Sequence, residues 1–341
     1  MLHRLTERTV LLVAALVVVL SLATVYAQYR ALIDISPGDS PRSFVAGPQV
    51  DRNEQALHGE GGDPWQFRVG SEVLAKGARN VAHAVGVGDP DVAGLLGFRV
   101  LQNIVIFALA WLLYRRLGAT AHLAALGLCL VAWAMSQAFF NSGLSFDTYG
   151  DLIAYLGAAL LILDRRYAWI VPLTVVAALN RETSGLIPLM LLATGLTVGR
   201  RTPEGRRALA IGGVALVAFA VTTVALRAIV GPGDVIHPHG KQIGWELFEL
   251  NVGRGVTWDK LFQTVTIVPV LAAAAWRHWQ PALRAFCVAI VPLWVAVHLV
   301  AAVLAETRLI LVPYVVVLVP GVLAGLGARS GGEAGVALAR A

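Results

Sequence analysis

Long apolar runs alternate with short polar segments along most of the chain. The first run extends from Thr9 to Ala27 and the last from Leu309 to Leu326. Runs of about 18–22 apolar residues cross a bilayer as helices, whereas apolar strands of soluble proteins cover only about 4–8 residues. The runs between these two lie near Ala93–Tyr114, Ala119–Phe139, Tyr149–Leu163, Tyr167–Leu179, Ser184–Val198, Ala208–Val230, Leu261–Trp276 and Ala285–Leu304. The pattern predicts an all-α, polytopic transmembrane helix bundle with about ten spans.

Two polar segments are longer than the rest, and both are expected on the same side of the membrane. Residues 28–94 form the first external loop, and residues 231–260 form the second. The first loop ends in a partly amphipathic stretch, Trp65–Val87, which predicts a helix at the membrane interface. The chain as a whole, residues 1–341, is expected to form a single integral membrane domain.

The arginines predict how the helices are oriented. Every short turn at one end of the predicted helices is basic; these turns contain Arg115, Arg116, Arg165, Arg166, Arg200, Arg201, Arg206, Arg207, Arg277 and Arg284. Cytoplasmic loops of membrane proteins carry an excess of Lys and Arg. We therefore expect a multi-pass protein of the inner (plasma) membrane, with both termini cytoplasmic and the other polar segments on the non-cytoplasmic face.

Composition supports the same class of protein. Of the 341 residues, 57% are hydrophobic and 14% are charged, whereas soluble domains carry about 45–50% apolar and about 25% charged residues. The net charge of +6 is accounted for by arginines at helix ends, so no nucleic-acid partner is expected. Cys129 and Cys287 both fall inside predicted spans, where a disulfide is not expected.

The turn Asn180-Arg181-Glu182 lies between two short apolar runs. Charged residues near membrane depth are costly unless they are paired or face a cavity, so they suggest function. Arg181 is a candidate ligand for a lipid-linked phosphate, with Glu182 orienting it and Asn180 in support. The alternative is a self-neutralising turn at the interface.

Glu306 and Arg308, just before the last run, repeat this combination of a carboxylate and a guanidinium. The planar guanidinium fork suits phosphate, and two arginines converging on one phosphate or diphosphate would make physical sense. The alternative is an interfacial anchor whose side chain extends towards water.

The segment from Asp63 to Arg68 combines a proline, two aromatic residues and a basic residue. Pro64 suits the first turn of a helix, and Trp65 and Phe67 favour the lipid interface. Arg68 could face a lipid headgroup or a phosphate. A helix that lies on the membrane for structural reasons is the alternative.

Asp147 and Asp151 are spaced so that a helix places both on one face. Two such carboxylates repel unless one is protonated or a cation lies between them. They could bind Mg²⁺ or Mn²⁺, or hold sugar hydroxyls. Alternatively, they are acids favoured by the positive dipole at a helix start.

Several acids in the first external loop are candidates for a general base, which would take a proton from an acceptor hydroxyl. Asp34 lies soon after the first apolar run and Asp63 lies further on; Asp39, Asp51 and Glu54 compete with them. The residues alone do not distinguish between these acids.

His237 and His239 lie near Lys241 in the second external loop. Two close histidines without further spaced ligands are weak evidence for a metal, so we expect no metal site and favour a loop that lines the substrate entrance. His298, inside an apolar run, is interpreted as a hydrogen-bonded packing residue.

Three short strings and the layout of the chain resemble a known class of membrane protein. The strings are Asp63-Pro64-Trp65-Gln66-Phe67-Arg68, Ala178-Leu179-Asn180-Arg181-Glu182-Thr183 and Glu306-Thr307-Arg308. Together with a long first external loop and about ten spans, they resemble the polytopic glycosyltransferases of the GT-C fold class, particularly compact bacterial glycosyltransferase-like membrane proteins.

The resemblance implies transfer of a sugar from a polyprenyl-phosphate donor to a glycan, lipid or protein acceptor on the non-cytoplasmic face. It implies that Asp34 or Asp63 is the acid that deprotonates the acceptor, and that Arg181 and Arg308 bind the departing phosphate. The chain departs from the class because no acidic pair follows its first helix. A transporter or flippase for a lipid-linked sugar, and a non-enzymatic assembly subunit, are the competing hypotheses.

Overall fold

The computed structural model describes residues 7–34, 45, 47–60, 62–138 and 143–338. Within these ranges the chain is helical, and its β structure is an isolated bridge between Asp63 and Val235. The α-helices are α1 (Glu7–Asp34), α2 (Gly47–His58), α3 (Val69–Val85), α4 (Pro90–Arg116), α5 (Ala121–Gln137), α6 (Phe146–Leu163), α7 (Ile170–Ala178), α8 (Leu186–Val198), α9 (Pro203–Val230), α10 (Trp245–Gly253), α11 (Gly255–Val265), α12 (Val268–Ala274), α13 (Pro281–Ala301), α14 (Leu311–Pro313) and α15 (Val319–Leu338).

Six helical segments are long and apolar enough to cross a membrane: Arg8–Asp34, Pro90–Arg116, Phe146–Leu163, Pro203–Val230, Pro281–Ala301 and Thr307–Ala328. Three apolar helical segments are shorter: Ala121–Gln137, Tyr167–Ala178 and Glu182–Val198. The predicted all-α, membrane-spanning class therefore agrees with the structure, whereas the count of ten spans is not confirmed.

The predicted span Leu261–Trp276 is not one helix. Helix α11 ends at Val265, and Thr266 has a positive φ of 52° with a ψ of −136° before α12 begins at Val268. A β-branched residue in this conformation is strongly disfavoured, so the break requires support from the surrounding structure. The apolar content of residues 261–276 predicted one continuous helix, whereas the structure has two helices, α11 and α12, separated by a break at Thr266.

The first helix is longer than its apolar run, and the first polar residue beyond Ala27, Gln28, is packed inside the protein. Gln28 donates to the Met135 carbonyl at 3.1 Å and accepts from Arg99 Nε at 3.1 Å. These bonds satisfy buried polar groups, and they carry α1 on to Asp34. The polar segment after α1 is thus shorter than the loop of residues 28–94 that the sequence predicted.

Several helix starts are explained by local sequence. Asp89 accepts from the Val92 amide in front of Pro90, and Thr202 accepts from the Gly205 amide in front of Pro203. Such side chains satisfy amides that have no partner within the helix, and proline suits the first turn because it lacks the N–H. Helices α4 and α9 therefore begin where the sequence places a cap.

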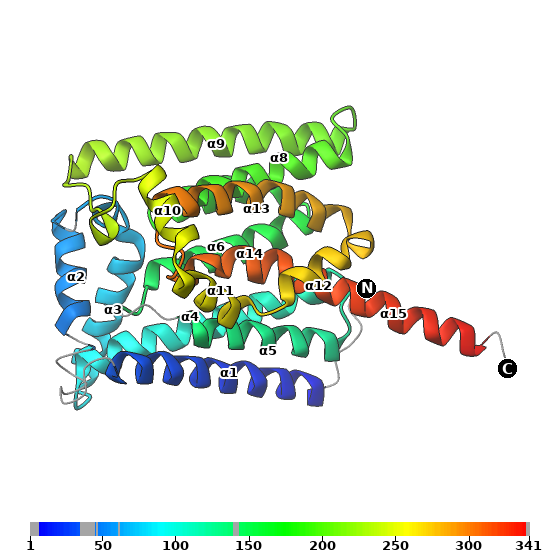
Figure 1. Ribbon diagram of the computed structural model, residues 1–341, viewed down its shortest axis with the longest axis horizontal. Helices are drawn as coiled ribbons and strands as arrows, with labels where there is room; N and C mark the ends of the chain where they lie inside the picture. Colours follow the sequence, from blue (N-terminus) through cyan, green and yellow to red (C-terminus); the bar gives the residue numbers. More distant parts are fainter. Residues whose placement is uncertain (1–6, 35–44, 46, 61, 139–142, 339–341) are drawn as a thin grey trace.

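Figure 1 shows the long helices running side by side, with α2 and α3 placed across one end of the bundle. We call this the site end. The described N-terminal residues and the projecting helix α15 lie at the opposite end. That opposite end, which we call the arginine-pair end, holds the last residues of α4, α6 and α8 and the turns that contain Arg115-Arg116, Arg165-Arg166 and Arg200-Arg201.

Candidate functional site

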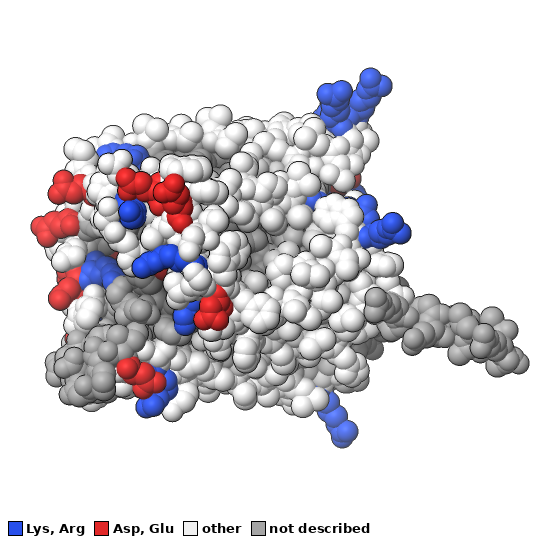
Figure 2. All heavy atoms as spheres, viewed as in Figure 1, with Lys and Arg blue, Asp and Glu red and all other residues white. Residues whose placement is uncertain are grey.

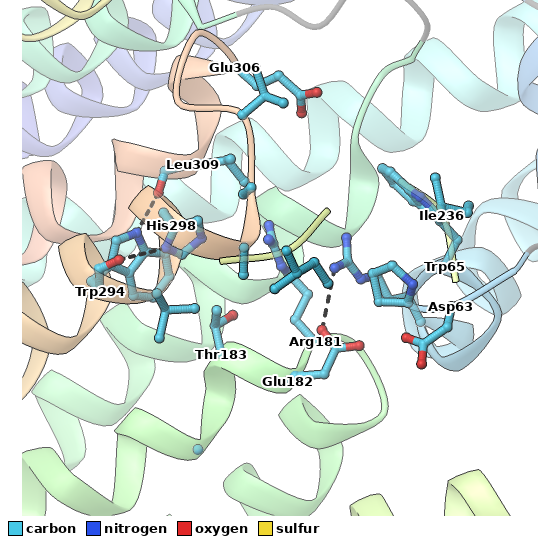
Figure 3. Close-up of a pocket in the computed structure, with 18 of the residues that line it drawn as sticks. Asp63, Trp65, Arg181, Glu182, Thr183, Ile236, Trp294, His298, Glu306 and Leu309 are labelled. Carbon is cyan, nitrogen blue, oxygen red and sulfur yellow. Dashed lines mark hydrogen bonds and ion pairs between the residues drawn. The ribbon is translucent and has the colours of Figure 1, made fainter. Parts of the chain in front are cut away.

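A cavity of about 620 Å³ opens at the site end, and it is lined by the segment from Asp63 to Arg68 in front of α3, the turns after α7 and α13, and residues of α8, α9 and α13. Figure 3 shows side chains from distant parts of the sequence meeting around it. Its polar wall includes Asp63, Arg68, Arg181 and Arg308. Residues separated by more than a hundred positions therefore share one concave surface, as expected for a ligand site.

Three guanidinium groups converge on the carboxylate of Asp147, at the start of α6. Arg68 Nη1 lies 2.9 Å from Asp147 Oδ2, Arg181 Nη1 lies 3.8 Å from the same oxygen, and Arg308 Nη1 lies 3.9 Å from Oδ1. All four side chains are largely buried. Three guanidinium groups carry more N–H donors than one carboxylate can accept from, so the cluster needs further acceptors.

Thr148 holds two of these arginines together. Its Oγ1 accepts from Arg181 Nη1 at 2.9 Å and from Arg308 Nη1 at 3.3 Å. The two guanidinium groups therefore meet at one hydroxyl, although they come from a turn after α7 and a turn after α13. Sequence analysis did not single out Thr148, because a threonine in the first turn of an apolar helix carries no functional signal by itself.

Asn180 locks the Arg181 turn against two other elements. Its Nδ2 donates to the Asp147 carbonyl at 2.6 Å, and the Ser71 hydroxyl donates to its Oδ1. The Gly70 amide also donates to the Leu179 carbonyl at 2.8 Å. The turn is thereby fixed to both α3 and α6, and Asn180 positions Arg181 from the side.

Further acids flank the arginines. Glu182 Oε2 lies 3.4 Å from Arg68 Nη2, and Glu306 Oε2 lies 2.9 Å from Arg308 Nη2. Asp151 accepts from the Thr183 hydroxyl at 2.7 Å. Burial opposes the charge of Arg68, but the carboxylates of Glu182 and Asp147 prevail and raise its pKa above the ordinary value.

Trp65 adds an aromatic surface beside the cluster. The guanidinium carbon of Arg68 lies 4.9 Å from the Trp65 ring centroid, that of Arg52 lies 5.6 Å away and that of Arg308 lies 5.8 Å away. Cations within about 6 Å of a tryptophan face are attracted by its electron-rich centre. Arg52, which sequence analysis did not select, thus belongs to the same group of charges.

Some buried donor and acceptor atoms have no hydrogen-bond partner within the described part of the cluster. The Nε atoms of Arg68 and Arg181 are buried without a hydrogen-bond partner among the described residues, as is Oε1 of Glu182. Buried polar atoms in folded proteins are nearly always bonded, so an exception calls for an explanation. Both Nε atoms are covered by the surrounding protein, so they reflect how tightly the charged groups are packed and not a contact that the cavity offers.

The opposite wall of the cavity is apolar, and it is formed by α9 and α13, which are long enough to cross the membrane, and by the shorter apolar helix α8. It includes Leu186 of α8, Phe219 of α9, and Leu293 and Val297 of α13. Leu293 and Val297 are exposed within the isolated protein. A ligand in this cavity would meet guanidinium groups at one end and a hydrocarbon-like surface at the other.

The two acids proposed as the base occupy different places. Asp63 lines the cavity, and its carboxylate lies 3.4 Å from Arg227 Nη1. Backbone bonds with Asp234 and Ile236 fix its main chain. Asp34 instead pairs with Arg30 of its own helix at 3.3 Å, is 62% exposed, and does not line the cavity.

The second external loop contributes to the cavity through other residues than those predicted. Val235, Ile236 and Ile243 line it, whereas His237, His239 and Lys241 do not. The three predicted residues are polar and exposed, so they face water rather than the enclosed space.

The other described acids of the first external loop that were candidates for the general base do not line the cavity. Asp51 and Glu54 lie on α2 outside the cavity lining. Asp39 falls outside the described residues.

The acids at the start of α6 are poorly suited to Mg²⁺ or Mn²⁺. Asp147 and Asp151 share a helix, but Asp147 already faces three guanidinium groups. Cations would repel a divalent ion there, and hard metals need several oxygen ligands. Across the described ranges, no group of three or more His, Cys, Asp or Glu side chains could hold a metal ion.

The arrangement as a whole suits an amphiphilic anion, with its charged group among the arginines and its apolar part along α8, α9 and α13. Guanidinium forks bind phosphate and carboxylate oxygens through two parallel bonds. Comparisons with models of protein families, with curated proteins and with solved structures found no match for this chain. Its own side chains are therefore what indicates its function.

Proposed function

We propose that this chain is a membrane glycosyltransferase of the GT-C kind, which transfers a sugar from a polyprenyl-phosphate donor to an acceptor on the non-cytoplasmic face. The observation that carries the proposal is the convergence of Arg68, Arg181 and Arg308 at a cavity whose other wall is apolar. A polyprenyl phosphate combines an anionic head with a long hydrocarbon chain. Its two parts match the two walls.

The chemistry follows from where charge develops. The acceptor oxygen bonds to the anomeric carbon of the sugar, the bond from that carbon to the phosphate oxygen breaks, and the polyprenyl phosphate leaves with the bonding electrons. Fixed guanidinium groups stabilise the charge that grows on this leaving group. Asp63, on the cavity wall, receives the acceptor proton.

The orientation proposed is the one that the basic turns favour. The arginine-pair end would lie in the cytoplasm with both termini, and the cavity would face the non-cytoplasmic side of the inner (plasma) membrane. Glycan, lipid and protein acceptors are all compatible with a cavity open at that end.

Transfer itself provides the main test. Membranes from cells that express the chain would receive polyprenyl-phosphate donors carrying radiolabelled hexoses or pentoses, and incorporation of label into acceptors would be measured. We expect Arg181→Gln to lower transfer by about 100- to 1,000-fold, because removal of one preorganised donor to a developing anion has this effect. The control Arg116→Gln, at the arginine-pair end, should stay within about twofold, as is usual for exposed sites.

The same experiment separates the competing functions. A transporter or flippase would move the labelled lipid across sealed vesicles and form no new glycosidic bond. An assembly subunit would tolerate both substitutions. Either result would overturn the proposal.

Orientation is tested by labelling from outside. In a chain with Cys129 and Cys287 replaced by alanine, Lys241→Cys at the site end should react with an impermeant maleimide added to intact cells. Arg200→Cys, in a turn of the opposite end, should react only after the membrane is opened. The reverse pattern would place the cavity in the cytoplasm and exclude an external transferase.

A further inference from the structure

His298 is a polar residue on the otherwise apolar side of the cavity. It lies in α13, within the candidate span Pro281–Ala301, and it is buried. It also lines the cavity that holds the arginines. Ionisable residues inside membrane-spanning helices are rare and commonly mark substrate contacts. The packing role expected from sequence therefore accounts for only part of its position.

One hydrogen bond defines the state of the imidazole ring. His298 Nδ1 lies 2.8 Å from the carbonyl oxygen of Trp294. A carbonyl can only accept, so Nδ1 carries the proton, and in the neutral ring Nε2 is left as an acceptor. Nε2 makes no hydrogen bond with the described residues. The cavity is then where this acceptor can find a donor.

The ring is held in place by a chain of aromatic contacts. It stacks on Trp294 with centroids 4.9 Å apart and planes at 18°. Trp294 Nε1 donates to the Leu309 carbonyl at 2.6 Å, and Tyr155 contacts the indole edge-on at 5.6 Å. The Tyr155 hydroxyl donates in turn to the Thr183 carbonyl, beside the Arg181 turn. His298 is therefore preorganised relative to the arginine cluster.

The acceptor on His298 complements the donors around it. Figure 3 shows the His298 side chain between Trp294 and Arg181. The phosphodiester of a glycosylated lipid carries no proton at neutral pH, and the bare monoester is mostly the dianion because its second pKa is about 6, so the phosphate of either lipid is a poor donor to Nε2. A sugar hydroxyl can donate to it. Within a glycosylated lipid phosphate, the group suited to Nε2 is therefore a hydroxyl of the attached sugar, rather than the phosphate itself.

We propose that His298 Nε2 accepts a hydrogen bond from a hydroxyl of the sugar on the lipid phosphate, so that His298 selects the glycosylated donor over the bare lipid phosphate. This inference rests on the proposed function. It assigns the arginines to the phosphate and His298 to the sugar. The two contributions can be measured separately, because the arginines bind both the glycosylated and the bare lipid phosphate, whereas His298 contacts only the glycosylated one.

The test measures two affinities on each purified, full-length protein in nanodiscs. The probes are farnesyl phosphate, and farnesyl phosphate carrying mannose, glucose or arabinose, of which the tightest binder is used. His298→Asn keeps an amide N–H that can donate to the Trp294 carbonyl, but it removes the Nε2 acceptor. His122→Asn, on the exposed side of α5, is the matched control.

We expect His298→Asn to weaken binding of the glycosylated lipid by about three- to tenfold, the usual effect of one hydrogen bond. Its affinity for farnesyl phosphate should be unchanged, and His122→Asn should change neither. Arg181→Gln should weaken both lipids together. The ratio of the two affinities remains informative even if His298→Asn lowers the thermal midpoint, because both are measured on the same folded molecules.

Two results would overturn the inference. Equal loss of both affinities, or loss of neither, in His298→Asn would return His298 to a packing role and leave the lipid-phosphate site intact. Failure of the unsubstituted protein to bind any of the lipids would instead contradict the proposed function itself, and this inference with it.

Discussion

The two ends of the bundle are both rich in arginine, but they use it in opposite ways. At the arginine-pair end, Arg116 and Arg165 are 52% and 72% exposed, and each pairs with a single acid of a neighbouring helix end. At the site end, Arg181 and Arg308 are 4% and 2% exposed and share one carboxylate and one hydroxyl. Figure 2 shows the contrast on one face, where basic side chains project from one end and mixed charges gather at the other.

The difference teaches that burial and convergence, rather than arginine content, distinguish a binding site from a topology signal. An exposed arginine beside the membrane costs little and sets orientation. Buried arginines that face each other repel and lose solvation, so they persist only where something offsets that cost. In this protein the offset comes from Asp147, Glu182 and Glu306, and in the proposed function from the donor phosphate.

The largest expected effect concerns the acids rather than the arginines. Asp63→Asn should lower sugar transfer by about 100- to 10,000-fold, because it removes the proposed general base. Asp34→Asn, which changes an exposed acid outside the cavity, is the matched control and should stay within about twofold. The measurement is initial rates of label transfer in membranes. If Asp63→Asn and Asp34→Asn lower the rate of transfer equally, Asp63 is not the general base.

The next prediction concerns the stability of the protein rather than the rate of transfer, and its test is a substitution of Asp147. Asp147→Asn leaves three arginines facing one another without their shared carboxylate, and loss of a buried partner costs about 3–5 kcal/mol of stability. Farnesyl phosphate should restore the thermal midpoint of this variant more than it raises that of the unsubstituted protein, because the anion replaces the missing carboxylate. The measurement is thermal unfolding in detergent with and without the lipid.

The control for Asp147→Asn is Asp164→Asn, whose carboxylate pairs with Arg116 at the other end. This control should show no extra stabilisation by farnesyl phosphate. If the lipid stabilises Asp147→Asn no more than it stabilises the unsubstituted protein, the arginines do not form an anion site.

The smallest effect belongs to the arginine-pair end. Arg116 Nη1 lies 2.6 Å from Asp164 Oδ1, in a pair whose arginine is exposed and whose aspartate is partly exposed. Exposed ion pairs contribute about 0–1 kcal/mol. A double-mutant cycle with Arg116→Gln and Asp164→Asn should therefore give a coupling energy within that range and leave transfer unchanged. A coupling energy of about 3–5 kcal/mol, the cost expected when a buried partner is lost, would mean that the two ends do not differ as described.

Some features of the candidate site could be predicted from local sequence. Asn180-Arg181-Glu182 and Glu306-Thr307-Arg308 stand out because charges interrupt apolar runs, and Arg68 lies in an aromatic segment with the same character. Thr148, Arg52 and His298 could not be selected in this way. A threonine at a helix start, an arginine in a polar helix and a histidine in an apolar run are each common where no ligand binds.

By itself, the sequence determined the helical, membrane-spanning class, several helix starts and the separation of basic turns from mixed polar segments. These depend on apolar length and on residues close together in the chain, and local interactions are enough to specify them. Only the tertiary structure decided that Asp63 and not Asp34 lines the cavity, that the run at 261–276 is broken, and that Thr148 joins two distant arginines. The reason is that these features depend on which helix ends pack together, and contacts between residues 33 and 160 positions apart leave no local pattern in the chain.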